Sequence, residues 1–401
     1  MLGRAVTEDH VMFKECIPVF RPNPNEQQPH FGKEEIREFY SYVLLDFELL
    51  EEWDYGNFKV MPTVRVDDLP GPYRAFIAPV KLPNWIHERH NSHFFTVGLS
   101  AVLSFATSRP VKYIRDDCYV TEGNILDVDF NELALKFPVL FAGTGAHETT
   151  ISKETSSKYY QKVKETLDVL FNVPYGLYVS LIQSIRLVQL AHLTKRDDFS
   201  LSYYLLASAI ENIAQKAITR DSVKDKHPLE KQWKILAESN EVIKELYKTY
   251  KESSGKNKYI SKRFSKFILK YCPVDTWELL EHPDQNKVSY YDELNYGNNW
   301  RWLTQKKWFE KYPSDLTQDE IETILSDLYK HRSNFTHQGL SPPHSYPDGH
   351  NRFFEEEHSS KIDDKTGKYY HETLIIPNYR LVSFIAYNSI IEFGKSKRAF
   401  K

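Results

Sequence analysis

At 401 residues, with 41% apolar and 27% charged side chains, the chain is typical of a globular protein and long enough for two domains. Its three cysteines, Cys16, Cys118 and Cys272, form no CxxC pair, which argues against a disulfide framework or a zinc ribbon and favours a reducing, cytoplasmic location. The net charge is uneven, because residues 1–150 carry −8 and the remainder carries +5. Since phosphate neutralisation supplies most nonspecific affinity for nucleic acid, any RNA is expected to bind the second part.

Residues 1–150 are expected to form a mixed α/β or β-rich domain with an acidic surface. A helix is predicted at residues 33–52, followed by strands at residues 58–66, 73–80, 94–105 and 111–120. Turn signals separate the strands, and Gly143-Thr144-Gly145 and residues 152–157 are interpreted as a linker. This domain is a candidate sensor or regulatory domain.

Residues 151–401 are expected to form an all-α bundle with a small hairpin insertion, so the predicted fold class is α+β. Helical periodicity predicts helices at residues 156–172, 175–194, 198–217, 228–252, 258–272, 317–337 and 377–394. Residues 341–357 look irregular, and a hairpin is predicted around residues 364–367 with residues 369–376 as its second strand. The irregular stretch begins beside the candidate site described below and could gate it.

No membrane association is expected. Residues 1–9 lack the apolar core of a signal peptide. The most apolar long stretch, residues 175–193, is interrupted by Gln183, Arg186 and Gln189, which predicts a buried helix and not a membrane span.

No metal or cofactor is expected either. His87, His90 and His93 have the spacing of ligands on one helix face, but Pro83 precedes them and no second ligand group is evident. The glycines at 143 and 145 lack the Lys-Ser/Thr of a phosphate-binding loop, so a plain loop is predicted there.

The clearest chemical signal is an arginine and a histidine, with four residues between them, at the end of a predicted helix. Thr317 and Glu320 form a capping box at the start of this helix. Its apolar stripe consists of Ile321, Ile324, Leu325 and Leu328. Arg332 continues the stripe, where an unpaired charge is costly, so it needs a partner, a water-filled cleft or a phosphate. His337 lies in the last turn before Gly339, where exposed carbonyls favour a protonated imidazole.

Two interpretations of this pair remain open. Arginine suits phosphate and histidine can move a proton near neutral pH, so together they could cleave RNA without a metal. Alternatively, Arg332 forms a structural ion pair and His337 only stabilises the helix end. Glu211 is either a surface residue beside Asn212 or the carboxylate that holds Arg332 in place.

A basic segment is the candidate RNA-binding surface. It comprises Lys256, Lys258, Lys262, Arg263, Lys266 and Lys270, interleaved with Tyr259, Phe264 and Phe267. Lys262 and Arg263 are the candidate substrate-binding residues. The alternative is a solvated helix face whose aromatic residues belong to the core.

Three segments, in order, resemble the HEPN superfamily and within it the Apea-like HEPN group. Tyr203-Tyr204-Leu205-Leu206-Ala207-Ser208-Ala209-Ile210-Glu211-Asn212-Ile213 resembles the early core helix, and residues 260–267 resemble the middle helix. The signature is similar to Leu328-Tyr329 … Arg332-Ser333 … Phe335 … His337 … Gly339. Many members carry Asn, Asp or His directly after the arginine, whereas this chain has Ser333 and then Asn334, a departure that bears on activity more than on fold. The resemblance spans residues 195–400 and says nothing about the first 150.

The resemblance implies a helical homodimer that acts as a metal-independent endoribonuclease in a prokaryotic phage-defence, abortive-infection or toxin system. Arg332 would bind the scissile phosphate, His337 would act as general base or general acid, and Ser333, Asn334 and Glu211 would support them. The products would be a 2′,3′-cyclic phosphate and a 5′-hydroxyl, and the substrate an RNA such as tRNA. A phage-derived or other trigger would act through residues 1–150. The alternative is a non-catalytic helical module that binds RNA or protein, in which Arg332 forms a structural ion pair.

Overall fold

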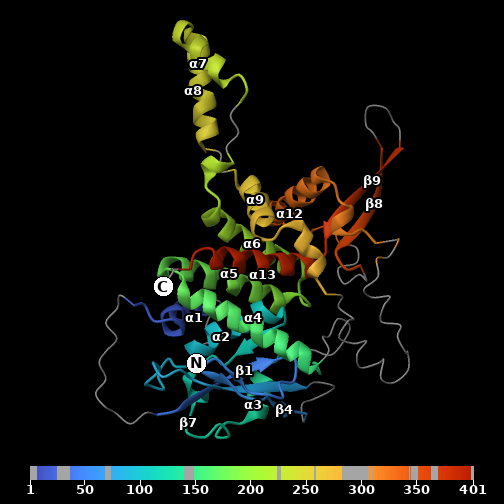
Figure 1. The fold of residues 1–401 in the computed structure, drawn as a ribbon. Helices are drawn as coiled ribbons and strands as arrows, with labels where there is room; N and C mark the ends of the chain where they lie inside the picture. The colour runs from blue at the N-terminus through green and yellow to red at the C-terminus, as the bar shows by residue number, and fades with distance from the viewer. Residues whose placement is uncertain are drawn as a thin grey trace.

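The fold is seen in a computed structural model, which places an antiparallel sheet at one end of the molecule and layers of helices above it (Figure 1). The structure describes residues 7–24, 37–67, 74–139, 149–223, 227–256, 259–281, 310–342, 351–362 and 369–398, and residues 306, 308 and 344. A helical hairpin and a two-stranded ribbon project from the helical layers (Figure 1). The α+β class expected from the sequence is confirmed.

The N-terminal sheet is antiparallel throughout. Its strands are β1 (Phe39–Leu45), β2 (Trp53–Asp54), β3 (Lys59–Val60), β4 (Val64–Val66), β5 (Ala75–Lys81), β6 (Val111–Tyr113) and β7 (Thr121–Glu122). The order is β2-β3-β5-β1-β6, with β4 also paired to β5 and β7 to β1. At the centre of the sheet, Val43 of β1 lies opposite Ala78 of β5.

The helix predicted over residues 33–52 is wrong within its described part, because residues 39–45 form β1. All of β1 except Tyr40 is buried, so its apolar residues show no alternation between a core face and a solvent face. Residues 33–36 lie outside the described residues. The strand predicted at residues 58–66 is two short strands separated by a segment that contains Pro62. The strand predicted at residues 73–80 corresponds to β5, and that at 111–120 is β6 followed by a 3₁₀ turn, Asp117–Tyr119.

Helix α2 (Phe94–Thr107) lies between the sheet and the helical layers. Residues 94–105 were expected to form a strand, and this prediction is wrong. The run carries no charge, but its hydroxyl residues Thr96, Ser100 and Ser104 recur every four residues, which is a helical spacing that the strand prediction overlooked. Every residue of α2 after Phe94 is buried. It packs against α1 (Thr7–Phe20), which the sequence pattern does not predict, and against β6, α4 and α5.

The helices predicted after residue 150 are largely confirmed. They are α4 (Lys153–Asn172), α5 (Tyr175–Thr194), α6 (Phe199–Ala217), α9 (Ile260–Tyr271), α12 (Gln318–Gln338) and α13 (Tyr379–Lys395). The helix predicted at residues 228–252 is instead two helices, α7 (Glu230–Ser239) and α8 (Glu241–Lys256), which meet at Asn240. Residues 152–157, expected in a linker, begin α4, and the Ser152 side chain caps it by accepting from the Thr155 amide. Residues 143–145 lie outside the described residues.

The predicted hairpin consists of β8 (Phe354–Ile362) and β9 (Tyr369–Pro377), paired antiparallel. Its turn lies outside the described residues. Strand β8 begins within the stretch expected to be irregular, residues 341–357, so the irregular segment is shorter than expected. A short helix, α3 (Phe130–Lys136), packs against β4 and β5 at the other end of the molecule.

The hydrophobic core crosses the predicted domain boundary near residue 150, because α2 contacts both α4 and α5. Polar side chains of α5 also bind the N-terminal part. Gln189 donates to the Val111 carbonyl at 2.8 Å and to the Ser100 hydroxyl at 2.9 Å, and Arg186 donates to the Tyr113 hydroxyl at 3.1 Å. The buried helix expected at residues 175–193 is thus confirmed. Within the described part of the chain, every helix is too short or too polar to cross a membrane.

Helix α1 packs closely on α2 at Gly98, and a substitution there tests this contact. A Cβ atom added at Gly98 would lie 2.8 Å from the Phe20 ring, too close for ordinary contact. We expect Gly98→Ala to lower the free energy of unfolding by about 1–3 kcal/mol through overpacking, as measured by urea denaturation. Gly176→Ala in α5 is the matched control, since a Cβ there meets nothing within 4 Å, and it should not destabilise. Equal stability of the two variants would contradict the close approach.

His192 makes the stability of this core depend on pH. It is buried between α5 and α13, where its Nδ1 lies 3.1 Å from the Tyr379 hydroxyl, and burial lowers its pKa to about 3. An unfolded histidine titrates near ~6.5. The neutral form therefore stabilises the fold above pH ~6.5, and this contribution is lost as the pH falls, by about 1.4 kcal/mol per unit.

We expect His192→Gln to remove this dependence. The free energy of unfolding, measured from neutral pH to moderately acidic pH, should fall less steeply for the variant than for the wild type. Because other titrating groups are common to both proteins, the difference between the two slopes isolates His192. Parallel slopes would show that His192 does not stay neutral in the folded chain.

Candidate functional site

The candidate site lies where α12 packs against α6 and α9. The capping box predicted from the sequence is present, because the Glu320 amide donates to the Thr317 hydroxyl and the Glu320 carboxylate accepts from the Thr317 amide. The predicted apolar stripe is buried: Ile321, Ile324, Leu325 and Leu328. The helix ends at Gly339, whose φ of +67° is the left-handed conformation that favours glycine at this position.

Arg332 continues this stripe inward and meets Glu211 of α6. Its Nε lies 2.8 Å from the Glu211 Oε2, and the Arg332 side chain is 20% exposed whereas the Glu211 side chain is 8% exposed. The other carboxylate oxygen, Oε1, accepts from the Gln215 side-chain amide at 2.7 Å. The interpretation of Glu211 as the partner that holds Arg332 is therefore the one that matches the geometry.

The Arg332 guanidinium also lies over the ring of Tyr204, with its Cζ 5.6 Å from the ring centroid. The Tyr204 ring packs on Phe335, with centroids 5.0 Å apart. Although Nε is close to Glu211, its N–H does not point at the carboxylate, and both atoms lack a hydrogen-bond partner among the described residues. Arg332 is thus held by charge and by stacking, while its hydrogen-bond donors remain unused within the described part of the chain.

His337 is exposed in the last turn of α12. Residues five apart on an α-helix point about 140° away from each other, since each residue turns the helix by about 100°. Arg332 accordingly points toward α6, whereas His337 points away from it toward solvent. The two predicted catalytic side chains, Arg332 and His337, therefore do not point toward a common site within one chain. Between them, Ser333 and Asn334 are half-buried.

Sequence reasoning missed two neighbours of Arg332. Tyr204 lies seven residues before Glu211, two helical turns away on the same face of α6, so this spacing was the available signal. His331 is half-buried, and burial lowers its pKa, with Asp327 opposing and His344 adding to the shift. Its Nε2 has no hydrogen-bond partner among the described residues.

Two side chains of the basic segment on α9, which was expected to bind RNA, bind backbone carbonyls instead. Arg263 donates through Nε to the Ile218 carbonyl at 2.7 Å and through Nη2 to the Gln215 carbonyl, and Lys266 donates to the Ser222 carbonyl at 2.8 Å. Arg263 thus caps the C-terminal end of α6, where the carbonyls carry partial negative charge, whereas Lys266 binds the 3₁₀ turn Arg220–Ser222 that follows.

Of the aromatic residues in this segment, Phe264 and Phe267 are fully buried and Tyr259 is half-buried. The two phenylalanines belong to the core, as the alternative interpretation holds. Lys262 is exposed and remains a candidate for RNA contact. Lys258 and the side chain of Lys256 lie outside the described residues.

No described cluster of three or more His, Cys, Asp or Glu side chains is arranged to hold a metal ion. In the histidine segment 87–93, the His90 Nδ1 lies 3.2 Å from the Asp117 carboxylate, and His93 is the residue that precedes the first turn of α2. Burial lowers the pKa of His93.

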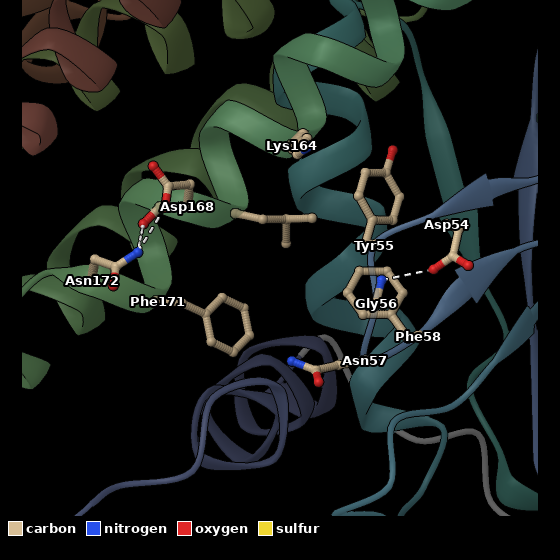
Figure 2. A pocket seen from close by; sticks show the side chains of 10 residues that line it. Asp54, Tyr55, Gly56, Asn57, Phe58, Lys164, Asp168, Phe171 and Asn172 are labelled. Carbon is tan, nitrogen blue, oxygen red and sulfur yellow. Dashed lines mark hydrogen bonds between the residues drawn. The ribbon is translucent and has the colours of Figure 1, made fainter.

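A cavity of about 440 Å³ lies elsewhere, between the turn that joins β2 to β3 and helix α4. Figure 2 shows Phe171 of α4 on one side and Tyr55 and Phe58 on the other, with Asn57 at the base. Asp54 accepts from the Gly56 amide at 2.7 Å and so shapes the turn. The cavity therefore lies between the part before residue 150 and the helical part.

No family model matches the chain, and neither curated proteins nor solved structures give a significant match. The function proposed below accordingly rests on the residues, their geometry and the resemblance described above.

The coupling between Glu211 and Arg332 can be measured by a double-mutant cycle of Glu211→Gln and Arg332→Met. Removing one partner leaves the other charge poorly solvated, so each single variant should lose about 1–2 kcal/mol, less than a fully buried pair because Arg332 keeps some solvent. The double variant should recover part of this loss. Urea unfolding gives the coupling.

The exposed pair Glu132–Lys136 on α3 is the control and should show little coupling. Additive losses at Glu211 and Arg332 would mean that the pair does not hold the arginine in place.

Proposed function

We propose that this chain is a metal-independent endoribonuclease that cleaves RNA by attack of the ribose 2′-hydroxyl. The observation that carries the proposal is Arg332, a guanidinium fixed by Glu211 and Tyr204 but with no hydrogen bond among the described residues. A structural arginine normally uses its donors within the fold.

A phosphate would supply the acceptors that Arg332 lacks. Guanidinium groups bind phosphate through two parallel, charge-assisted hydrogen bonds. Bound in this way, Arg332 would stabilise the charge that develops on the phosphate oxygens, an effect typically worth about 10²–10³ in rate. Glu211 is a positioning residue in this scheme, because it fixes the guanidinium without contacting RNA.

His337 would move the proton, either from the 2′-hydroxyl or to the leaving 5′-oxygen. Because Arg332 and His337 point apart on one helix, one chain does not supply a complete site. A two-fold homodimer would place the histidine of one copy near the arginine of the other and provide both a base and an acid. The products would be a 2′,3′-cyclic phosphate and a 5′-hydroxyl. Ser333, Asn334 and Lys262 would contact the RNA around the scissile bond, and tRNA is a candidate substrate.

The part before residue 150 would act as the sensor of a phage-defence or toxin system in the prokaryotic cytoplasm. Its core is continuous with α4 and α5, so a signal would pass through packed helices and not through a mobile linker. The cavity beside Phe58 and Phe171 lies at this junction, where ligand sites commonly occur.

A second candidate is a non-catalytic module, and the ion pair itself favours it. With Glu211 within 2.8 Å, Arg332 has a structural partner and needs no phosphate. The two candidates differ in whether the free donors of Arg332 have a function.

Purified protein should cleave RNA in the presence of EDTA, with end-group analysis showing 2′,3′-cyclic phosphates. Arg332→Lys keeps the charge beside Glu211 but loses the fork, and should lower the rate by at least about 10²-fold. His337→Gln changes an exposed residue and should lower it by about 10²–10⁴-fold without affecting folding.

Two exposed residues provide matched controls, Lys330→Ala on α12 and His358→Gln on β8, and both should retain activity. Cleavage that needs a divalent cation would reject the mechanism. Full activity in folded Arg332→Lys and His337→Gln would favour the non-catalytic module.

A further inference from the structure

The cavity beside α4 is built by one face of that helix and one short segment of chain. Residues 54–58, where β2 turns into β3, form one wall. The volume of about 440 Å³ lies within the range of small-molecule sites, about 300–1,000 Å³. The α4 residues that form the other wall recur at helical spacing and so share one face: Lys164, Leu167, Asp168, Phe171 and Asn172.

The walls of the cavity are aromatic, and other rings support them. Figure 2 shows Phe171 on one side and Tyr55 and Phe58 on the other. Phe58 packs edge-on against Phe95 of α2, with ring centroids 5.0 Å apart. Phe171 packs against Phe20 of α1, with centroids 5.9 Å apart. Because the walls are already held in place, a flat ring could enter without the cost of ordering them.

The charges at the cavity favour an anion. Both carboxylates that line it already have a cation, since the Lys59 Nζ lies 2.9 Å from Asp54 and the Arg398 Nη1 lies 2.7 Å from Asp168. Lys164 is exposed and makes no hydrogen bond or ion pair with another described residue. Its ammonium is therefore available to an anionic group on a ligand.

A neutral polar group lies at the other end of the cavity. Figure 2 shows Asn57 at the opposite end from Lys164, with the aromatic walls between them. The Asn57 side chain is exposed and has no hydrogen bond to another described residue. An amide can both donate and accept, so it suits a polar atom on the edge of a ring.

We propose that this cavity binds a small aromatic anion, meaning a flat ring that carries a carboxylate or a phosphate. The ring packs between Phe171 and Phe58, the anionic group binds Lys164, and Asn57 bonds with a polar atom on the ring edge. Under the proposed function this ligand would be the signal that the junction senses. The binding itself stands whether or not RNA is cleaved.

Isothermal titration calorimetry of the full-length protein with two pairs of probes tests the site. Indole-3-acetate is compared with 3-methylindole, and adenosine 5′-monophosphate with adenosine, so each pair differs in the anionic group. At least one anion should bind with a Kd below about 1 mM, and its neutral counterpart at least about tenfold more weakly. The anion that binds distinguishes carboxylate from phosphate. Binding of neither anion, or equal binding of both members of a pair, would overturn the proposal.

The cation is tested by Lys164→Gln. This variant should bind the anionic probe at least about tenfold more weakly and its neutral counterpart as the wild type does, because only the charge contact is removed. Lys153→Gln, at an exposed lysine of α4 outside the cavity, is the matched control and should bind as the wild type does.

The location is tested by Asn57→Trp, which places a large side chain at the base of the cavity. Because Asn57 is exposed, the variant should unfold in urea as the wild type does, yet it should bind neither member of the pair. An anion that still binds both Lys164→Gln and Asn57→Trp with wild-type affinity lies elsewhere, and the proposal is then wrong. Ligand binding by a protein that cleaves no RNA would count against the ribonuclease alone.

Discussion

Helix α2 sets the constraint on which the rest of the structure depends. Helix α2 has no charged residue and is buried all round, so it must be enclosed on every side, and no single element can do this. The sheet and α1 cover part of α2, and α4 and α5 cover the remainder. Because α4 and α5 also support α6 and α13, the β-rich part and the helical part share one core. The hydrogen bonds of Gln189 to Val111 and Ser100 fix the angle of this junction.

Helix α6 connects this shared core to the candidate site, because it packs on α5 and carries Glu211. It packs against α5, α9, α12 and α13, so Glu211 has little freedom, and Arg332 is positioned by a carboxylate on a rigid element. Sites built on packed helices hold their geometry better than sites on loops. His337, by contrast, lies at an exposed helix end, and its position is set only by α12. The two residues therefore differ in how firmly the fold holds them.

Features that depend on spacing along one helix could be predicted from the sequence. The capping box at Thr317 and the stripe that ends at Arg332 follow from spacing along one helix. A charge on that stripe called for a partner, a water-filled cleft or a phosphate, and the structure shows a carboxylate partner, Glu211. Residues 39–45 were predicted wrongly because burial on both faces removes the alternation typical of a strand. Residues 94–105 were predicted as a strand although Thr96, Ser100 and Ser104 recur at helical spacing, because the apolar residues around them dominate the pattern. Arg263 was expected to contact RNA because it belongs to a basic segment, but a helix C-terminus attracts cations as a phosphate does, and Arg263 binds the end of α6. Only tertiary structure shows which of the two is present.

The ion pair between Glu211 and Arg332 has a consequence for how a polyanion would reach the site. A guanidinium already neutralised by a carboxylate at 2.8 Å produces little long-range field. Encounter with such a polyanion would then depend on diffusion and on charges elsewhere, and the association rate would respond weakly to ionic strength at this position. Under the proposed function, Arg332 would therefore bind a phosphate only at contact and would contribute little to attracting one from bulk solvent.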